Sequence, residues 1–196
     1  LGVHIFSGGK IKVFVNRISV ILILFLLAGC QSNKNAVKLN KVYVTDTTPV
    51  DLLSPDCITE NIEQMQLFEG NFGKNSFSSF LILSADKSKI EILMVNEMGI
   101  QIGSVFYDGQ ECIMDSSFFP KNLKSEYIIL DLQNVYADST ILKEHYKKYG
   151  IDFVDQENKR QLIKNGKHIE EITKEEEKIT IKNDLRSYTY VLKLLK

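Results

Sequence analysis

The amino-acid sequence predicts an antiparallel α+β domain, in which two helices interrupt a series of β-strands. Three observations support this fold class. Apolar and polar residues alternate with a period of two in two blocks, residues 62–115 and 151–195. The turns within each block are short, whereas a parallel crossover needs about a dozen residues or more. Between the blocks lie two stretches with the spacing of helices.

The first 29 residues have the features of a signal peptide. Three basic residues precede an apolar run, Ile18 to Leu27, and no acidic residue occurs before Cys30. This run is shorter than the roughly 20 residues of a membrane-spanning helix. The sequence Leu27-Ala28-Gly29-Cys30 is similar to the lipobox of bacterial lipoproteins. We therefore expect residues 1–29 to be removed and Cys30 to carry a covalent lipid; the alternative is a signal anchor with an incidental cysteine.

The rest of the chain is predicted to contain a tether and one domain. Residues 30–56 would form the lipidated N-terminus and tether, and residues 57–196 the domain. Residues 41–57, which include Pro49 and Pro55, are expected to run extended along the domain surface.

The predicted lipid would attach the protein to a membrane. Gln31 replaces the aspartate that retains enteric lipoproteins in the inner membrane, so the expected location is the periplasmic face of the outer membrane. Loss of three of the 24 basic residues with the signal peptide leaves 21 against 25 acidic ones. This balance argues against a nucleic-acid partner.

The first block of alternation predicts five strands joined as a meander, near residues 62–72, 76–85, 89–96, 99–107 and 110–115. Turn sequences separate them, and Asp108-Gly109 is among the strongest hairpin sequences because both residue types tolerate positive φ.

Two helices are expected after this meander. Residues 123–135 are apolar on nearly every side, which is typical of a buried helix. A second helix is predicted over residues 139–149, with Asp138 as its N-cap and Gly150 at its end.

The second block of alternation predicts five more strands, at 151–155, 159–164, 167–173, 177–183 and 187–195. Asn165-Gly166 is a second strong hairpin sequence. In the last strand Tyr188, Tyr190, Leu192 and Leu194 share a face.

No local motif of catalysis, metal binding or nucleotide binding occurs, so we expect neither an enzyme nor a cofactor beyond the lipid on Cys30. After residue 30 the histidines are His145 and His168, without the spacing of a zinc site. Glu170-Glu171 is interpreted as a solvated pair. Cys57 and Cys112 could form a disulfide, or remain as two reduced, partly buried thiols.

Some strands are apolar on both faces, as in residues 80–83 and 92–95. One explanation is a well-packed core. The other is a curved sheet that encloses an apolar cavity, plugged by the helix at 123–135 and large enough for an acyl chain. The candidate lining residues are Phe80, Ile82, Ile92, Met94, Ile102, Phe106, Ile128 and Leu132.

Four segments resemble a family of bacterial lipoproteins known as domain of unknown function 3261. They are NEMGIQIGSVFYDGQECIM, LKSEYIILDLQNVYADSTIL, KRQLIKNGKHIEEI and KITIKNDLRSYTYVLKL, in this order between residues 96 and 194. The chain departs from the family pattern at Tyr136-Ala137, where Trp-Pro is usual.

The resemblance implies an architecture similar to LolA and LolB, the carrier and receptor of lipoprotein sorting. That fold is a half-open antiparallel barrel, here of about ten strands covered by two helices, with acyl chains inside. The expected ligand is an acyl chain of a lipid, glycolipid, polyene lipid or lipoprotein, and the expected partners are the membrane and a carrier protein or export machinery. The alternative function is a structural or interaction lipoprotein with a closed core.

Overall fold

The computed structural model describes residues 36–38, 41–72, 74–116 and 124–195. The chain divides into two units, Leu1–Asn33 and Lys34–Lys196, and all described residues belong to the second. The predicted signal peptide and the predicted lipidation site at Cys30 therefore lie outside the described residues.

One antiparallel sheet of 11 strands forms the body of the domain. Its first half contains β4 (Ile62–Phe72), β5 (Asn75–Ala85), β6 (Ile90–Val95), β7 (Gln101–Tyr107) and β8 (Glu111–Asp115). Its second half contains β9 (Asp152–Gln156), β10 (Lys159–Lys164), β11 (Lys167–Glu175), β12 (Lys178–Asn183) and β13 (Tyr188–Leu194). These are the ten predicted strands; β1 (Ala36–Lys38) adds an eleventh beside β8.

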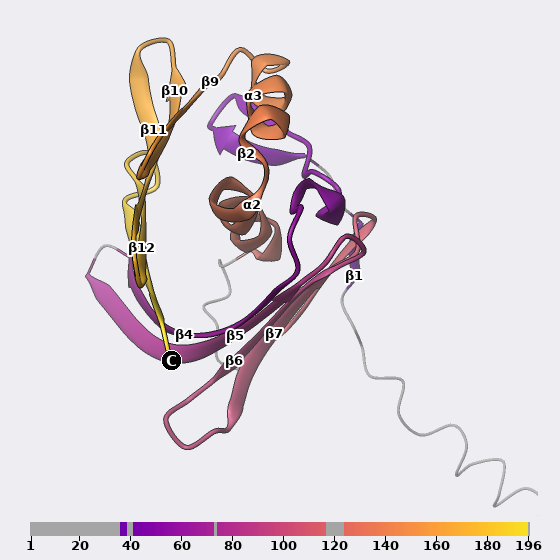
Figure 1. Ribbon diagram of the computed structural model, residues 1–196, viewed down its shortest axis with the longest axis vertical. Helices are drawn as coiled ribbons and strands as arrows, with labels where there is room; N and C mark the ends of the chain where they lie inside the picture. The colour runs from indigo at the N-terminus through magenta and orange to yellow at the C-terminus, as the bar shows by residue number, and fades with distance from the viewer. Residues whose placement is uncertain (1–35, 39–40, 73, 117–123, 196) are drawn as a thin grey trace, which may run out of the picture. The chain divides into compact units, whose positions relative to one another are not determined.

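The two halves join where β4 pairs with β13, with Phe68 opposite Leu192. The strand order is β1-β8-β7-β6-β5-β4-β13-β12-β11-β10-β9, so β1 and β9 are the two edges. Figure 1 shows the sheet curving around one helix without closing on itself. The predicted α+β half-open barrel is confirmed.

The predicted hairpin turns have the backbone that their residues favour. Asn165 and Gly166 both have positive φ, 52° and 72°, as a tight hairpin of this type requires. Gly109 follows Asp108 with φ 90°. Local turn chemistry therefore accounts for the positions of these two turns.

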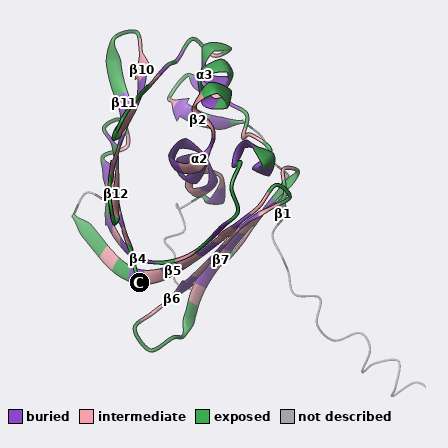
Figure 2. Cartoon of the chain, viewed as in Figure 1, coloured by how far each residue is buried: buried purple, intermediate pink, exposed green. Residues whose placement is uncertain are grey.

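Two helices connect the halves of the sheet. Helix α2 (Ser125–Tyr136) lies against the concave face and is mostly buried, whereas α3 (Ser139–Lys147) has an exposed side (Figure 2). Asp138 caps α3 as predicted, accepting hydrogen bonds from the amides of Thr140 at 2.8 Å and Ile141 at 3.1 Å. Neither α2 nor α3 is long and apolar enough to cross a membrane, nor is any other helix in the described ranges.

The segment after β1 is not extended along the surface, so that expectation for residues 41–57 is wrong. It forms a hairpin of β2 (Val42–Thr45) and β3 (Thr48–Val50), followed by a short 3-10 helix, η1 (Pro55–Cys57). Val42, Val44 and Val50 are buried in the main core. The alternation of valine with polar residues in this segment explains the hairpin, since one face of it packs inward.

Candidate functional site

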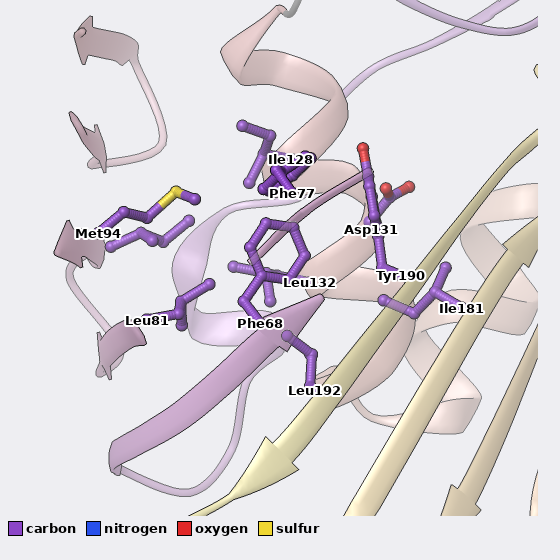
Figure 3. Close-up of a pocket in the computed structure, with 11 residues that line it drawn as sticks. Phe68, Phe77, Leu81, Met94, Ile128, Asp131, Leu132, Ile181, Tyr190 and Leu192 are labelled. Carbon is purple, nitrogen blue, oxygen red and sulfur yellow. The ribbon is translucent and has the colours of Figure 1, made fainter. Parts of the chain in front are cut away.

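An apolar pocket lies between α2 and the concave face of the sheet (Figure 3). Its cavity volume is about 40 Å³, and it is partly open to solvent. Its walls are formed almost wholly by apolar atoms, and Asp131 is its one ionisable carboxyl. The lining residues are Phe68, Phe77, Leu81, Ile92, Met94, Ile128, Asp131, Leu132, Ile181, Tyr190 and Leu192.

Strand alternation and register bring the lining side chains together. Leu81 of β5 lies opposite Met94 of β6, and Ile181 of β12 lies opposite Tyr190 of β13, so each pair points to the same face. The remaining wall is α2, whose residues 128, 131 and 132 are spaced three and four apart and share one side of the helix. Figure 3 shows Met94 and Leu81 at one end of the pocket and Asp131, Tyr190 and Ile181 at the other.

Aromatic rings form part of the pocket wall at Gly70. The ring of Phe77 lies over this glycine, where an added Cβ would come within 2.5 Å of two ring carbons. Phe68 contacts Phe77 edge to face at 5.1 Å between centroids and contacts Tyr190 at 5.3 Å. Phe77 and Ile128 are only half-buried, so the pocket meets solvent beside them.

The predicted lining residues fall into two groups. Ile92, Met94, Ile128 and Leu132 line the pocket. Phe80, Ile82 and Phe106 lie on the opposite, outer face, because Leu81, Val105 and Tyr107 take the inward positions of their strands.

Ile102 occupies the β-bulge between β6 and β7 and packs against the core outside the pocket. The inward orientation expected for Phe80, Ile82 and Phe106 is therefore wrong by one residue of register.

Seven lining residues were not predicted as such, and six of them come from strands. Tyr190 and Leu192 were expected to share a face, and this face turns out to be the concave one. Helical spacing alone indicates that residues 128, 131 and 132 share one side of α2. Because Asp131 is an aspartate among apolar residues, however, the residue pattern provided no reason to place that side in a cavity wall.

A buried polar network lies next to the pocket and connects α2 to the second half of the sheet. Asn134 donates to Glu170 of β11 at 2.8 Å, and Tyr146 of α3 donates to Asn134 at 2.6 Å. Tyr188 of β13 donates to both carboxyl oxygens of Asp131 at 2.9 Å. Asp131 and Glu170 are each 3% exposed. Glu170 is therefore buried, and the interpretation of Glu170-Glu171 as a solvated pair is wrong for this residue.

The carboxyls of Asp131 and Glu170 are buried close enough together to interact directly. Two carboxylates offer only acceptors, so this contact requires a proton on one of them. Burial, and then the charge of Glu170, hold the pKa of Asp131 well above its usual range. Burial also raises the pKa of Glu170. The pair therefore retains a proton at pH values where a free carboxyl has lost it.

The C-terminal end of α2 is held by cations from the sheet. The Arg160 guanidinium donates to the carbonyl oxygens of Asn134, Val135 and Ala137, each at 3.0 Å. The Lys174 ammonium donates to Val135 O at 2.6 Å, and burial lowers the pKa of Lys174 to about 8. These bonds satisfy carbonyls that a helix leaves unpaired, and they fix one end of the pocket wall.

The histidines and cysteines considered for catalysis or metal binding do not form one site. His145 is buried on α3 against Tyr146 and Tyr149, whereas His168 is exposed on β11. Cys57 and Cys112 are free and buried, and burial raises their thiol pKa values to about 12 and about 11. Within the described ranges, no three His, Cys, Asp or Glu side chains gather to hold a metal ion.

A family model described as "Protein of unknown function (DUF3261)" matches residues 63–196. The chain belongs to this family. The match begins in β4 and includes every lining residue of the pocket. The β2–β3 hairpin precedes the part that defines the DUF3261 family. A comparison with curated proteins returned no match.

Proposed function

We propose that this protein is a lipoprotein of the periplasmic face of the outer membrane that binds or transfers an acyl chain and performs no chemistry on it. The observation that carries this proposal is the apolar pocket, which remains open after α2 has packed against the sheet. Asp131, the one carboxyl among the described lining residues, accepts a hydrogen bond from Tyr188 and lies beside Glu170. The described walls therefore offer a polar substrate few hydrogen-bond partners.

An acyl chain suits these walls because it needs no hydrogen bond from the protein. Each methylene group removed from water contributes about 0.8 kcal/mol, which offsets the cost of association. Met94 and the aromatic side chains beside it can adjust to chains of different shape.

The proposed location, the periplasmic face of the outer membrane, is inferred from the sequence. The basic start, the short apolar run and Leu27-Ala28-Gly29-Cys30 support lipidation of Cys30, and Gln31 supports the outer membrane. The resemblance to LolA and LolB, the carrier and receptor of lipoprotein sorting, supports the same location. Incorporation of labelled palmitate that disappears in Cys30→Ser would test this anchor independently of the pocket.

Native mass spectrometry tests the binding function. Residues 31–196 would be exported behind a cleavable signal peptide and purified without detergent. The proposal expects a reproducible adduct with the mass of a lipid, or an adduct with added palmitate or lysophospholipid. A folded protein that carries no lipid and takes up neither probe would favour the alternative function, a structural or interaction lipoprotein with a closed core.

A further inference from the structure

The outer face of the sheet is apolar in its first half. Partly exposed apolar side chains project from five neighbouring strands, β4 to β8, and the most exposed of the named set is Met65, at 45%. Met65, Ile82 and Leu93 lie opposite one another in a continuous row across three strands. We name this surface the apolar outer face; its main residues are Met65, Phe80, Ile82, Leu93, Phe106 and Ile113.

The second half of the same sheet has a different outer face. There Lys159 pairs with Glu171 at 2.8 Å, and Lys178 pairs with Glu175 at 2.9 Å. Ion pairs of this kind are typical of a strand surface that faces only water. A contiguous apolar patch on one half only is typical of an interaction surface.

No described element covers the apolar outer face. Figure 1 shows α2, α3 and the β2 strand on the concave side of the sheet, away from it. The side chains are therefore available to something outside the described part of the chain.

Strand register places the start of the described chain at the border of this face. Ala36, the first residue of β1, lies opposite Ile113, and Ile113 lies opposite Phe106. Cys30 precedes Ala36 by six positions, which span at most about 20 Å when fully extended. A lipid on Cys30 would thus keep this border close to a bilayer, and such tethering raises the effective concentration of even a weak contact.

We propose that the apolar outer face rests on the surface of the membrane that holds the anchor, an inference that relies on the proposed lipidation of Cys30. The charges at its border indicate the type of lipid. Glu63 and Glu111 are exposed there, and Glu91, which lies opposite Phe106, is paired with Lys89 at 2.6 Å. Because acidic groups are repelled by anionic head groups, the surface that fits is one of zwitterionic phospholipid.

Tryptophan fluorescence can test this docking, because the chain contains no tryptophan. Single reporters would be introduced as Phe80→Trp on the apolar outer face and as Thr180→Trp, the matched control, on the outer side of β12. The full lipidated protein would be reconstituted in phosphatidylcholine vesicles whose acyl chains carry bromine, a contact quencher. We expect strong quenching in Phe80→Trp, several-fold weaker quenching in Thr180→Trp, and a decrease in the former when phosphatidylglycerol is added.

The outcomes separate this inference from the proposals on which it depends. Protein that floats with the vesicles but is quenched equally in both variants would overturn the docking alone. Protein that does not float would overturn the anchor at Cys30 and the docking with it, while the lipid adduct of residues 31–196 still tests the pocket. Weak quenching in Phe80→Trp together with a dimer would assign the face to a second copy and overturn the docking.

Discussion

Replacing Asp131 with asparagine is expected to flatten the dependence of folding stability on pH. In the folded protein Asp131 and Glu170 retain a proton at pH values where the unfolded chain has released it, because burial raises both pKa values. The free energy of unfolding therefore falls as the pH rises from about 4, the usual carboxyl pKa, toward the raised value of the folded state. One proton of difference corresponds to a slope of at most about 1.4 kcal/mol per pH unit.

Asparagine has nearly the shape of aspartate, can accept the Tyr188 hydrogen bond and can donate to Glu170 without a titratable proton. Asp131→Asn should thus gain stability relative to the native protein as the pH rises from 5 to 8. Urea unfolding of residues 31–196, followed by far-ultraviolet circular dichroism at several pH values, measures this difference.

Glu171→Gln provides a control of opposite sign on the same strand. The hydrogen bond from Lys159 lowers the pKa of Glu171, so its contribution is present at neutral pH and is lost as the pH falls. The glutamine variant should lose a little stability at neutral pH, and less at acidic pH. An identical pH slope in the native protein and in Asp131→Asn would refute the retained proton.

Three further substitutions or treatments follow from the site. Leu81→Phe fills the pocket and should abolish the lipid adduct at a cost of about 1–2 kcal/mol, whereas Ile82→Phe, one residue along on the outer face, should keep it. Arg160→Met removes the cation bound to the carbonyl oxygens of Asn134 and Ala137, whereas Val135 keeps Lys174, and should cost about 2–4 kcal/mol in urea unfolding; a loss below about 0.5 kcal/mol would contradict the role of these bonds. In residues 31–196 a thiol reagent should modify both buried cysteines only after unfolding, and finding no thiol in the unfolded chain would show a disulfide instead.

Most of the secondary structure could be predicted from local patterns. Alternation located ten strands, and the turn residues Asp108-Gly109 and Asn165-Gly166 located hairpins, because neighbouring residues decide these features. The pairing of β4 with β13 joins residues more than a hundred positions apart. Alternation does not contain this information, so residue patterns alone could not show how the two halves form one sheet.

The site was less accessible to sequence reasoning, for two physical reasons. Strands such as β5 are apolar on both faces, so alternation could not decide whether Phe80 or Leu81 points inward. Glu170 and Glu171 look alike in sequence, and the burial of the first depends on residues distant in the chain, such as Asn134 and Asn183, which donate hydrogen bonds to it. Three of the four predicted lining residues that do not line the pocket, Phe80, Ile82 and Phe106, lie on the apolar outer face.

Methyl resonances of the methionines test the central claim, that the pocket holds an acyl chain, most directly. The protein has four methionines, of which Met94 lines the pocket, Met65 lies on the outer face and Met98 is 79% exposed in the β6–β7 turn. Titration of ¹³C-methyl-labelled residues 31–196 with palmitate below the concentration at which it forms micelles should shift the Met94 resonance and leave Met65 and Met98 unchanged. Binding of palmitate with no change in the Met94 resonance, or with shifts confined to Met65 and Met98, would contradict the claim that the pocket holds an acyl chain.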